Sequence, residues 1–187
     1  MESKDDVLLE SDDKMSKCIV FLHQEFAGVR TGKASPSLVE DITVPYYGAP
    51  TRLRELANIA TPEPRLLVIN PYDPTSLAAI EKAILAANIG LTPMNDGRVI
   101  RIPIPELSGE RRVEMAKVIK RMAEEARVAI RNVRREANDT IKNLLKEHKI
   151  TEDEKDEGLK ECQTMTDDYI KKVDDSLAAK EKEIMAV

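Results

Sequence analysis

Few residues of this chain could do catalytic chemistry, and none has a partner at a useful spacing. His23 has no histidine, cysteine or carboxylate at metal-ligand spacing, and His148 lies near an expected helix end, where a positive charge is favoured. The acidic pairs 12–13 and 167–168 are typical of solvated helix faces, not of an acid/base couple in a cleft. We therefore predict that the protein is not an enzyme and has no catalytic residue, metal or cofactor.

Two further features could suggest chemistry. Residues 28–33, GVRTGK, are loosely similar to a phosphate-binding loop, but the glycine spacing differs and no strand precedes them. The two cysteines, Cys18 and Cys162, lie far apart in sequence, each on an apolar helical stripe. This placement favours buried free thiols over a disulfide.

The strongest pattern lies between residues 108 and 149. Apolar residues recur there at steps of three and four, which predicts one long α-helix from Ser108 to about Lys149. The apolar stripe consists of Ile119, Met122, Ala126, Ile130, Val133, Ala137, Ile141 and Leu144.

A second set of residues projects from another face of the same helix, at about 100° per residue. We call this set the basic ridge: Lys120, Arg127, Arg131, Arg134, Asn138 and Lys142, with Lys117 and Arg135 at its edge. Only Glu124 interrupts it, and Glu125, Glu136 and Asp139 collect elsewhere. A face needed only for solubility would more often alternate its charges. The sorted charges and the planar fork of arginine favour a phosphate-bearing partner, and burial of the apolar stripe should leave the ridge in solvent.

Composition supports a folded protein with long exposed helices. Of 187 residues, 42% are hydrophobic and 34% charged, with a net charge of −5. Residues 106–149 nevertheless carry twelve basic side chains against eight acidic ones, whereas 150–187 carry six against twelve. Aromatics make up 3%, with no tryptophan, which argues against base-stacking platforms. The acidic start and the lack of a long apolar run predict a cytoplasmic protein without a membrane partner.

Two more helices are expected to pack against the long one. Ser3 can cap a helix reaching about Val29, and Thr151 with Glu154 forms a capping box for a C-terminal helix. Their stripes are Leu8, Ser11, Met15, Ile19, Leu22, Phe26 and Val29, and Leu159, Cys162, Met165, Tyr169, Val173, Leu177 and Ile184. Three helices with one stripe each predict a monomeric three-helix bundle.

Between the first two helices the sequence changes to a strand-like pattern. We expect strands over 38–44, 46–47, 53–59 and 65–69, and a helix over 75–88 with Leu77, Ile80, Ile84 and Leu85 inward. A hairpin should follow at residues 95–97. The fold class is therefore α+β: a discontinuous bundle, 1–30 and 106–187, bearing an inserted β/α/β domain, 31–105. The two chain crossings predict a double-stranded hinge formed by Thr31, Gly32, Lys33, Pro103, Ile104 and Pro105.

Several segments closely resemble the bacterial ribosome recycling factor family over nearly the whole chain. They are VRTGKASPSL at 29–38, YYG at 46–48, NDG at 95–97, VIRIP at 99–103 and ARVAIRNVRR at 126–135. The resemblance implies a bundle and inserted domain in an L-like, two-domain arrangement. It also implies action after termination with elongation factor G, which hydrolyses GTP, to split the ribosome and release mRNA and deacylated tRNA.

The resemblance also implies which residues touch large-subunit ribosomal RNA at the subunit interface. Carried over position by position, these are Arg30, Arg112, Arg131 and Arg134; helical geometry alone adds Arg127 and Arg135 to the set. The chain departs from the family pattern at Glu106, at Ser108-Gly109 and at 62–64, near the hinge rather than on the ridge. The alternative is a helical RNA-binding or scaffold protein without ribosome-splitting activity.

Overall fold

The computed structural model describes residues 3–186, which form two compact units. Unit 1 comprises Met1–Val29 and Arg112–Val187, and unit 2 comprises Arg30–Arg111. Unit 2 is thus inserted between parts of unit 1 that are far apart in sequence. Together they give the predicted fold class, a helical bundle with an inserted α+β unit.

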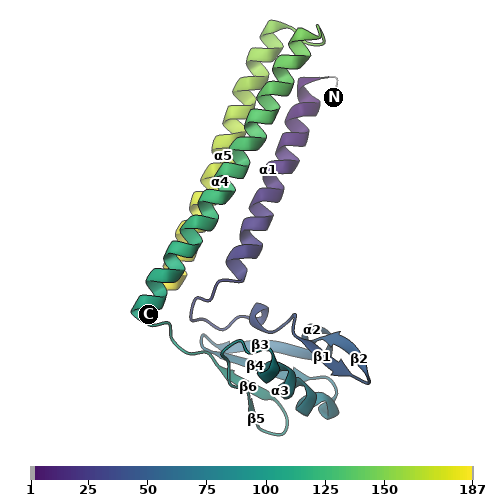
Figure 1. The fold of residues 1–187 in the computed structure, drawn as a ribbon, viewed down its shortest axis with the longest axis vertical. Coiled ribbons are helices and arrows are strands. Elements are labelled where there is room, and N and C mark those ends of the chain that lie inside the picture. The colour runs from purple at the N-terminus through teal and green to yellow at the C-terminus, as the bar shows by residue number, and fades with distance from the viewer. Residues whose placement is uncertain (1–2, 187) are drawn as a thin grey trace. The chain divides into compact units, whose positions relative to one another are not determined.

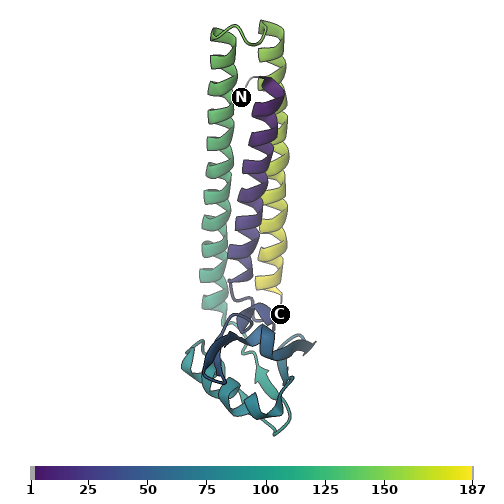
Figure 2. The same cartoon turned by 90° about the vertical axis from the view of Figure 1, so that its right-hand side faces the viewer.

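Unit 1 consists of three long helices that run side by side: α1 (Lys4–Ala27), α4 (Gly109–Lys146) and α5 (Glu152–Met185) (Figures 1 and 2). The predicted helix starts are confirmed. Ser3 and Thr151 each form a reciprocal capping box, with Asp6 and Glu154, and the Ser108 hydroxyl accepts the Arg111 N–H at 3.3 Å.

The end of α4 is set by a residue in the left-handed region. His148 has φ of 56°; its N–H donates to the Leu145 carbonyl at 3.0 Å and the Lys149 N–H to the Leu144 carbonyl at 2.9 Å. These two bonds are those of a Schellman motif, whose left-handed position usually holds glycine. The helix therefore stops at Lys146, three residues before the expected end.

The apolar stripes form the bundle interior in two adjoining clusters. Of the stripe predicted in α4, Ile119, Ile130, Ala137, Ile141 and Leu144 are buried. Met122, Ala126 and Val133 are half-buried at the rim, whereas Ala123, which was not predicted, is fully buried. At Gly158 a Cβ would lie 3.3 Å from Ile141 Cδ1 and 3.6 Å from Lys4 Cβ, so a small residue lets the three helices approach.

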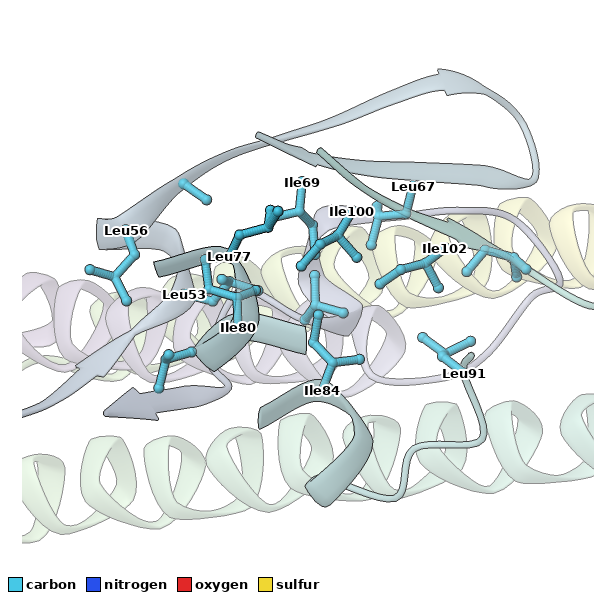
Figure 3. Close-up of a cluster of buried hydrophobic side chains, with 14 residues drawn as sticks. Leu53, Leu56, Leu67, Ile69, Leu77, Ile80, Ile84, Leu91, Ile100 and Ile102 are labelled. Carbon is cyan, nitrogen blue, oxygen red and sulfur yellow. The ribbon is translucent and has the colours of Figure 1, made fainter. Parts of the chain in front are cut away.

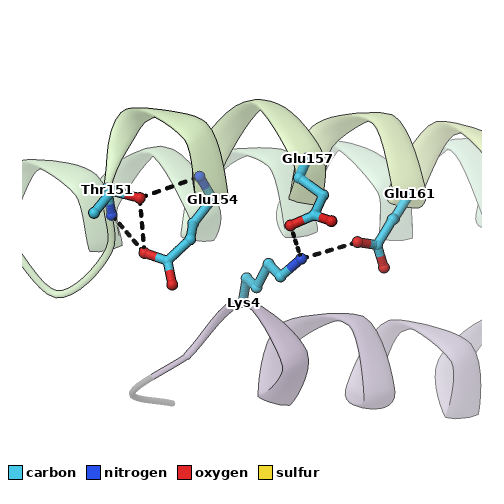
Figure 4. A network of polar contacts seen from close by, with 5 residues as sticks. All are labelled: Lys4, Thr151, Glu154, Glu157 and Glu161. Carbon is cyan, nitrogen blue, oxygen red and sulfur yellow. Dashed lines mark hydrogen bonds and ion pairs between the residues drawn. The ribbon is translucent and has the colours of Figure 1, made fainter.

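Polar side chains fix α1 against α5. Lys4 Nζ pairs with Glu157 and, at 2.9 Å, with Glu161 (Figure 4), and these bonds raise its pKa. Further along, the Tyr169 hydroxyl donates to Asp12 Oδ1 at 2.7 Å. His23 Nε2 lies 2.9 Å from Ser176 Oγ, so this histidine joins two helices, as an ordinary helix residue would.

Unit 2 contains only antiparallel strands (Figure 1). The hairpin of β1 (Thr43–Tyr46) and β2 (Ala49–Arg52) is separate from a sheet with the order β3-β4-β6-β5. That sheet comprises β3 (Ala57–Glu63), β4 (Leu66–Pro71), β5 (Met94–Asn95) and β6 (Ile100–Pro103). The helices are α2 (Leu53–Leu56) and α3 (Leu77–Ala86), with 3₁₀ turns at Pro36–Leu38 and Pro74–Ser76.

One core holds unit 2 together (Figure 3). Leu67 and Ile69 of β4 and Ile100 and Ile102 of β6 are fully buried and lie against α3. Alternate residues of each strand face the helix, as the pleat of a sheet requires. The hairpin predicted at residues 95–97 is present: β5 pairs with β6, and Gly97 has φ of 89°.

Three local predictions in unit 2 were wrong. Residues 38–42 are not extended, because Pro36 starts a 3₁₀ turn and the Val39 N–H donates to its carbonyl. Residues 53–56 form a helical turn that buries Leu53 and Leu56, whose spacing of three suits a helix. Leu85 is 56% exposed, since the inner face of the short α3 is filled by Leu77, Ile80 and Ile84.

Two of the proposed hinge residues are held within unit 2. Pro103 pairs with Leu66 in the sheet, and the buried Ile104 donates its N–H to the Arg65 carbonyl at 2.8 Å. The connection that leads from α1 into unit 2 is bonded at Pro64, the residue before Arg65: the Ala34 N–H donates to the Pro64 carbonyl at 2.7 Å. Both connections therefore enter unit 2 next to each other, and the hinge itself stays a prediction.

Candidate nucleic-acid interface

The basic ridge of α4 is divided by its distance from α5. Lys117, Lys120, Arg135 and Lys142 are exposed, whereas Arg127, Arg131, Arg134 and Asn138 are half-buried. The sequence predicted that the whole ridge would face solvent. That prediction was wrong for the second group, because long side chains next to the apolar stripe lie across the seam between α4 and α5.

Arg127 is the most strongly neutralised member of the ridge. Its Nη2 and Nε lie 2.6 Å and 2.9 Å from Asp174 Oδ1 of α5, and its Nη1 lies 2.9 Å from Glu124 Oε2. Burial disfavours its charge, but the hydrogen bonds to Asp174 and Glu124 outweigh burial and raise the Arg127 pKa. With its side chain only 19% exposed, this arginine is built into the bundle.

Glu124, the acidic residue that interrupts the ridge, accepts hydrogen bonds from two arginines. Besides Arg127 it accepts a hydrogen bond from Arg131 Nη1 at 3.1 Å. These bonds, from Arg127 first and Arg131 second, lower the pKa of Glu124. Arg131 keeps a side chain that is 40% exposed and one ion pair on its own helix, so part of its guanidinium faces outward.

Arg134 has a different environment. Its Nη1 donates to the neutral Gln163 Oε1 of α5 at 2.8 Å, and its Nε is buried with no hydrogen-bond partner among residues 3–186. No acidic side chain in that range pairs with it. The neighbouring Cys162 thiol is buried, which raises its pKa, while the positive charge of Arg134 works in the opposite direction.

Three further arginines were predicted to bind RNA. Within the described chain, Arg30, Arg112 and Arg135 form no ion pair. Arg135 is exposed on α4, Arg112 is half-buried in the first turns of that helix, and Arg30 is exposed in unit 2. Arg131, Arg134 and Arg135 therefore lie close together on one element, whereas Arg30 belongs to the other unit.

Part of the charge sorting seen in the sequence has an internal cause. Lys120 pairs with Glu181 of α5 at 3.1 Å, as Arg127 does with Asp174. On another side of α4, Glu136 lies 3.5 Å from Lys14 of α1. The acidic α5 thus supplies carboxylate partners for two ridge positions, Lys120 and Arg127.

The residues that could do other chemistry stay apart. In the described part of the chain, no three His, Cys, Asp or Glu residues are placed to hold a metal ion, and no helix is apolar and long enough to cross a membrane. The cysteines are free thiols: Cys162 is buried as predicted, whereas Cys18 is half-buried.

The fold and the surface define a class of protein. It has a helical bundle with an inserted α+β unit and arginines gathered on one helix, features that are typical of proteins that bind an anionic partner.

Comparison with known proteins identifies the family. The model of the family "Ribosome recycling factor" matches residues 22–185. The chain is 54% identical to the ribosome-recycling factor of Carboxydothermus hydrogenoformans and 53% identical to that of Bacillus subtilis, each over 97% of this chain and 98% of the relative. The chain belongs to the ribosome recycling factor family, as its sequence motifs indicated, and the family is one of non-enzymatic translation factors.

Solved structures agree. A solution structure of the ribosome recycling factor matches with a TM-score of 0.79 and 42% identity, covering 98% of both chains. A second match, with a TM-score of 0.68 and 41% identity, covers 98% of this chain and all of the other. That structure contains models of the T. thermophilus ribosome recycling factor and E. coli elongation factor G bound to the E. coli post-termination complex.

The sequence did not predict the α5 residues that accept hydrogen bonds from the ridge arginines. Asp174 and Gln163 lie 47 and 29 residues from their arginine partners, and nothing in a single helix pattern links them. The signal available was the acidic excess of residues 150–187, which could have suggested that α5 neutralises part of α4.

Proposed function

We propose that the protein recycles ribosomes after translation termination. It binds the post-termination ribosome and, with elongation factor G and GTP, promotes subunit separation and release of mRNA and deacylated tRNA. Family membership supports this activity, and the structural match to a factor bound with elongation factor G supports the partner. The cytoplasm, where ribosomes translate, is the proposed location.

The proposed contact with ribosomal RNA is the arginine group of α4. Arg131, Arg134 and Arg135 lie within two turns, and Arg134 and Arg135 have no acidic partner among the described residues. Arg30 and Arg112 are proposed to add contacts. Arg127 has the weakest case, because Asp174 and Glu124 already satisfy its guanidinium.

The proposed separation of the ribosomal subunits depends on movement of unit 2 relative to the helical bundle. The bundle holds the RNA, elongation factor G pushes unit 2, and the two paired connections guide the movement. Of the predicted hinge residues, Thr31, Gly32, Lys33 and Pro105 would take up the motion, whereas Pro103 and Ile104 would move with unit 2, to which they are bonded. Ala34 and Ile104 support this idea, since they fasten the two connections at adjacent residues of unit 2. Scattering or NMR couplings that show the same interdomain angle in every condition would contradict it.

The decisive experiment compares two arginines of α4. Arg134→Ala should weaken ribosome co-sedimentation about tenfold and lower the slope of log affinity against log salt by about one. Arg121→Ala is the control, because Arg121 is exposed and pairs with Glu125 on another sector of the helix. Subunit splitting with elongation factor G and GTP is measured by light scattering. Normal splitting by Arg134→Ala would rule out this contact, and absence of splitting by the unaltered protein would rule out the function.

A further inference from the structure

The two best-defined arginines of the ridge are held by α5 in chemically different ways. Asp174, a carboxylate, takes two hydrogen bonds from Arg127, at 2.6 Å and 2.9 Å. Gln163, a neutral amide, takes one from Arg134 at 2.8 Å. Both contacts fix a guanidinium on the seam between the same two helices, but only the first cancels its charge.

We propose that Gln163 is a positioning residue for Arg134: it holds the guanidinium on the bundle surface and leaves its full charge for a phosphate group. The inference rests on the proposed function and deepens it, since it names the residue that keeps one arginine of the interface available. Gln163 itself need not touch RNA.

The direction of the Gln163 amide is determined by a second residue. Its Nε2 donates to Asp167 Oδ1, one turn further along α5, at 2.8 Å. An amide has one acceptor side and one donor side, so a bond from Nε2 to a carboxylate turns Oε1 toward the arginine. Asp167 therefore orients the amide oxygen that accepts from Arg134.

The inner part of Arg134 shows that this contact is not built for maximal stability. Its Nε is buried without a partner among residues 3–186, and so is Oδ1 of Asn138, one turn further along α4. An unsatisfied buried donor is unfavourable, and Arg127 avoids it by bonding through Nε to Asp174. Arg134 is thus anchored by its buried stem and by one neutral acceptor, an arrangement suited to recognition.

The test is Gln163→Glu, which changes an amide to a carboxylate of the same size. The new charge should pair with Arg134 and lower the affinity for the large ribosomal subunit about tenfold, with unchanged or raised thermal stability. Gln24→Glu is the matched control. Gln24 is the other glutamine of the chain and is exposed on α1, so this substitution adds the same negative charge on a different helix. That variant should bind like the unaltered protein.

A double-mutant cycle separates positioning from simple repulsion. In an Arg134→Ala background, Gln163→Glu should cause less than a twofold further loss, because the residue through which it acts is gone. A similar tenfold loss in both backgrounds, or normal binding by Gln163→Glu alone, would overturn the inference. Failure of the unaltered protein to bind ribosomes would refute the proposed function instead, so the two failures are distinguishable.

Discussion

The bundle and the inserted unit use their polar side chains differently. In unit 1 these side chains join helices that are distant in sequence: Tyr169 donates to Asp12, 157 residues away, and Arg127 bonds to Asp174, 47 residues away. In unit 2 they mostly act within a turn, since Asp96 accepts from the N–H groups of Arg98 and Val99.

The difference follows from the geometry of the two folds. A helix satisfies its own backbone, so neighbouring helices can slide or rotate, and polar pairs decide which faces meet. A sheet pairs its backbone between strands, and its register is fixed by which residues face the core. Unit 2 also has longer polar links. The Tyr46 hydroxyl donates to Asp73 and ties the β1–β2 hairpin to the 3₁₀ turn at Pro74–Ser76, and Arg65 pairs with Glu106, 41 residues away.

The largest expected effect comes from the two cores. Ile141→Ala in the bundle and Ile69→Ala in unit 2 each remove a fully buried side chain and should cost about 2–5 kcal/mol of unfolding free energy. Because the cores are separate, each variant should accelerate hydrogen exchange in its own unit. Equal acceleration in α5 and in the sheet by Ile69→Ala would mean that the units unfold together.

A second test concerns the long-range bond of Tyr169. Burial, and then the bond to Asp12, raises the pKa of this hydroxyl to about 12. The folded protein thus favours the neutral hydroxyl of Tyr169. Its contribution to the free energy of unfolding is complete below the ordinary tyrosine pKa of about 10 and is lost as pH rises toward 12. Tyr169→Phe should be less sensitive to alkali in urea unfolding between pH 9 and 12.

The control for that experiment is Tyr47→Phe. Tyr47 lies in unit 2 and is 84% exposed. Its replacement should leave the alkaline loss of stability as it is in the unaltered protein. A steep alkaline loss that persists in Tyr169→Phe would show that the bond does not hold the bundle together.

A smaller effect is expected at the start of α5. Thr151→Ala removes the side chain that accepts the Glu154 N–H and should destabilise the bundle by about 1 kcal/mol. Thr164→Ala is the matched control, because Thr164 is exposed and, among residues 3–186, its hydroxyl bonds only to the Lys160 carbonyl of its own helix. If both threonines contribute equally in thermal unfolding, the capping box is not what stabilises the helix start.

The smallest effect compares a helix end in each unit. His148→Gly after α4 should stabilise the bundle by about 0.5 kcal/mol, since glycine adopts a φ of 56° without strain but loses more backbone entropy on folding. Asn88→Gly after α3, at φ of 49°, should gain less, because asparagine tolerates this region better. Chemical denaturation would measure both, and a loss of stability in His148→Gly would show that its side chain matters more than its backbone.

Much of this architecture could be predicted from local sequence. The apolar spacing of three and four predicted the helices that are now α1, α4 and α5, and the three helix starts followed from Ser3, Ser108 and Thr151. The hairpin at 95–97 followed from its turn residues. Short stretches of unit 2 were harder: Leu53 and Leu56 fit a strand or one helical turn, and only the core into which they pack decided between them.

The sequence by itself determined that α4 carries an apolar stripe and a basic ridge, because both depend on the helical repeat alone. It also identified the family, through motifs in the same order and spacing. Only the tertiary structure decided which arginine is paired with an acidic side chain of α5 and which with a neutral one. That choice depends on whether the residue of α5 across the seam is Asp174 or Gln163, and the packing of two helices, not the repeat of either one, brings those side chains within hydrogen-bond distance.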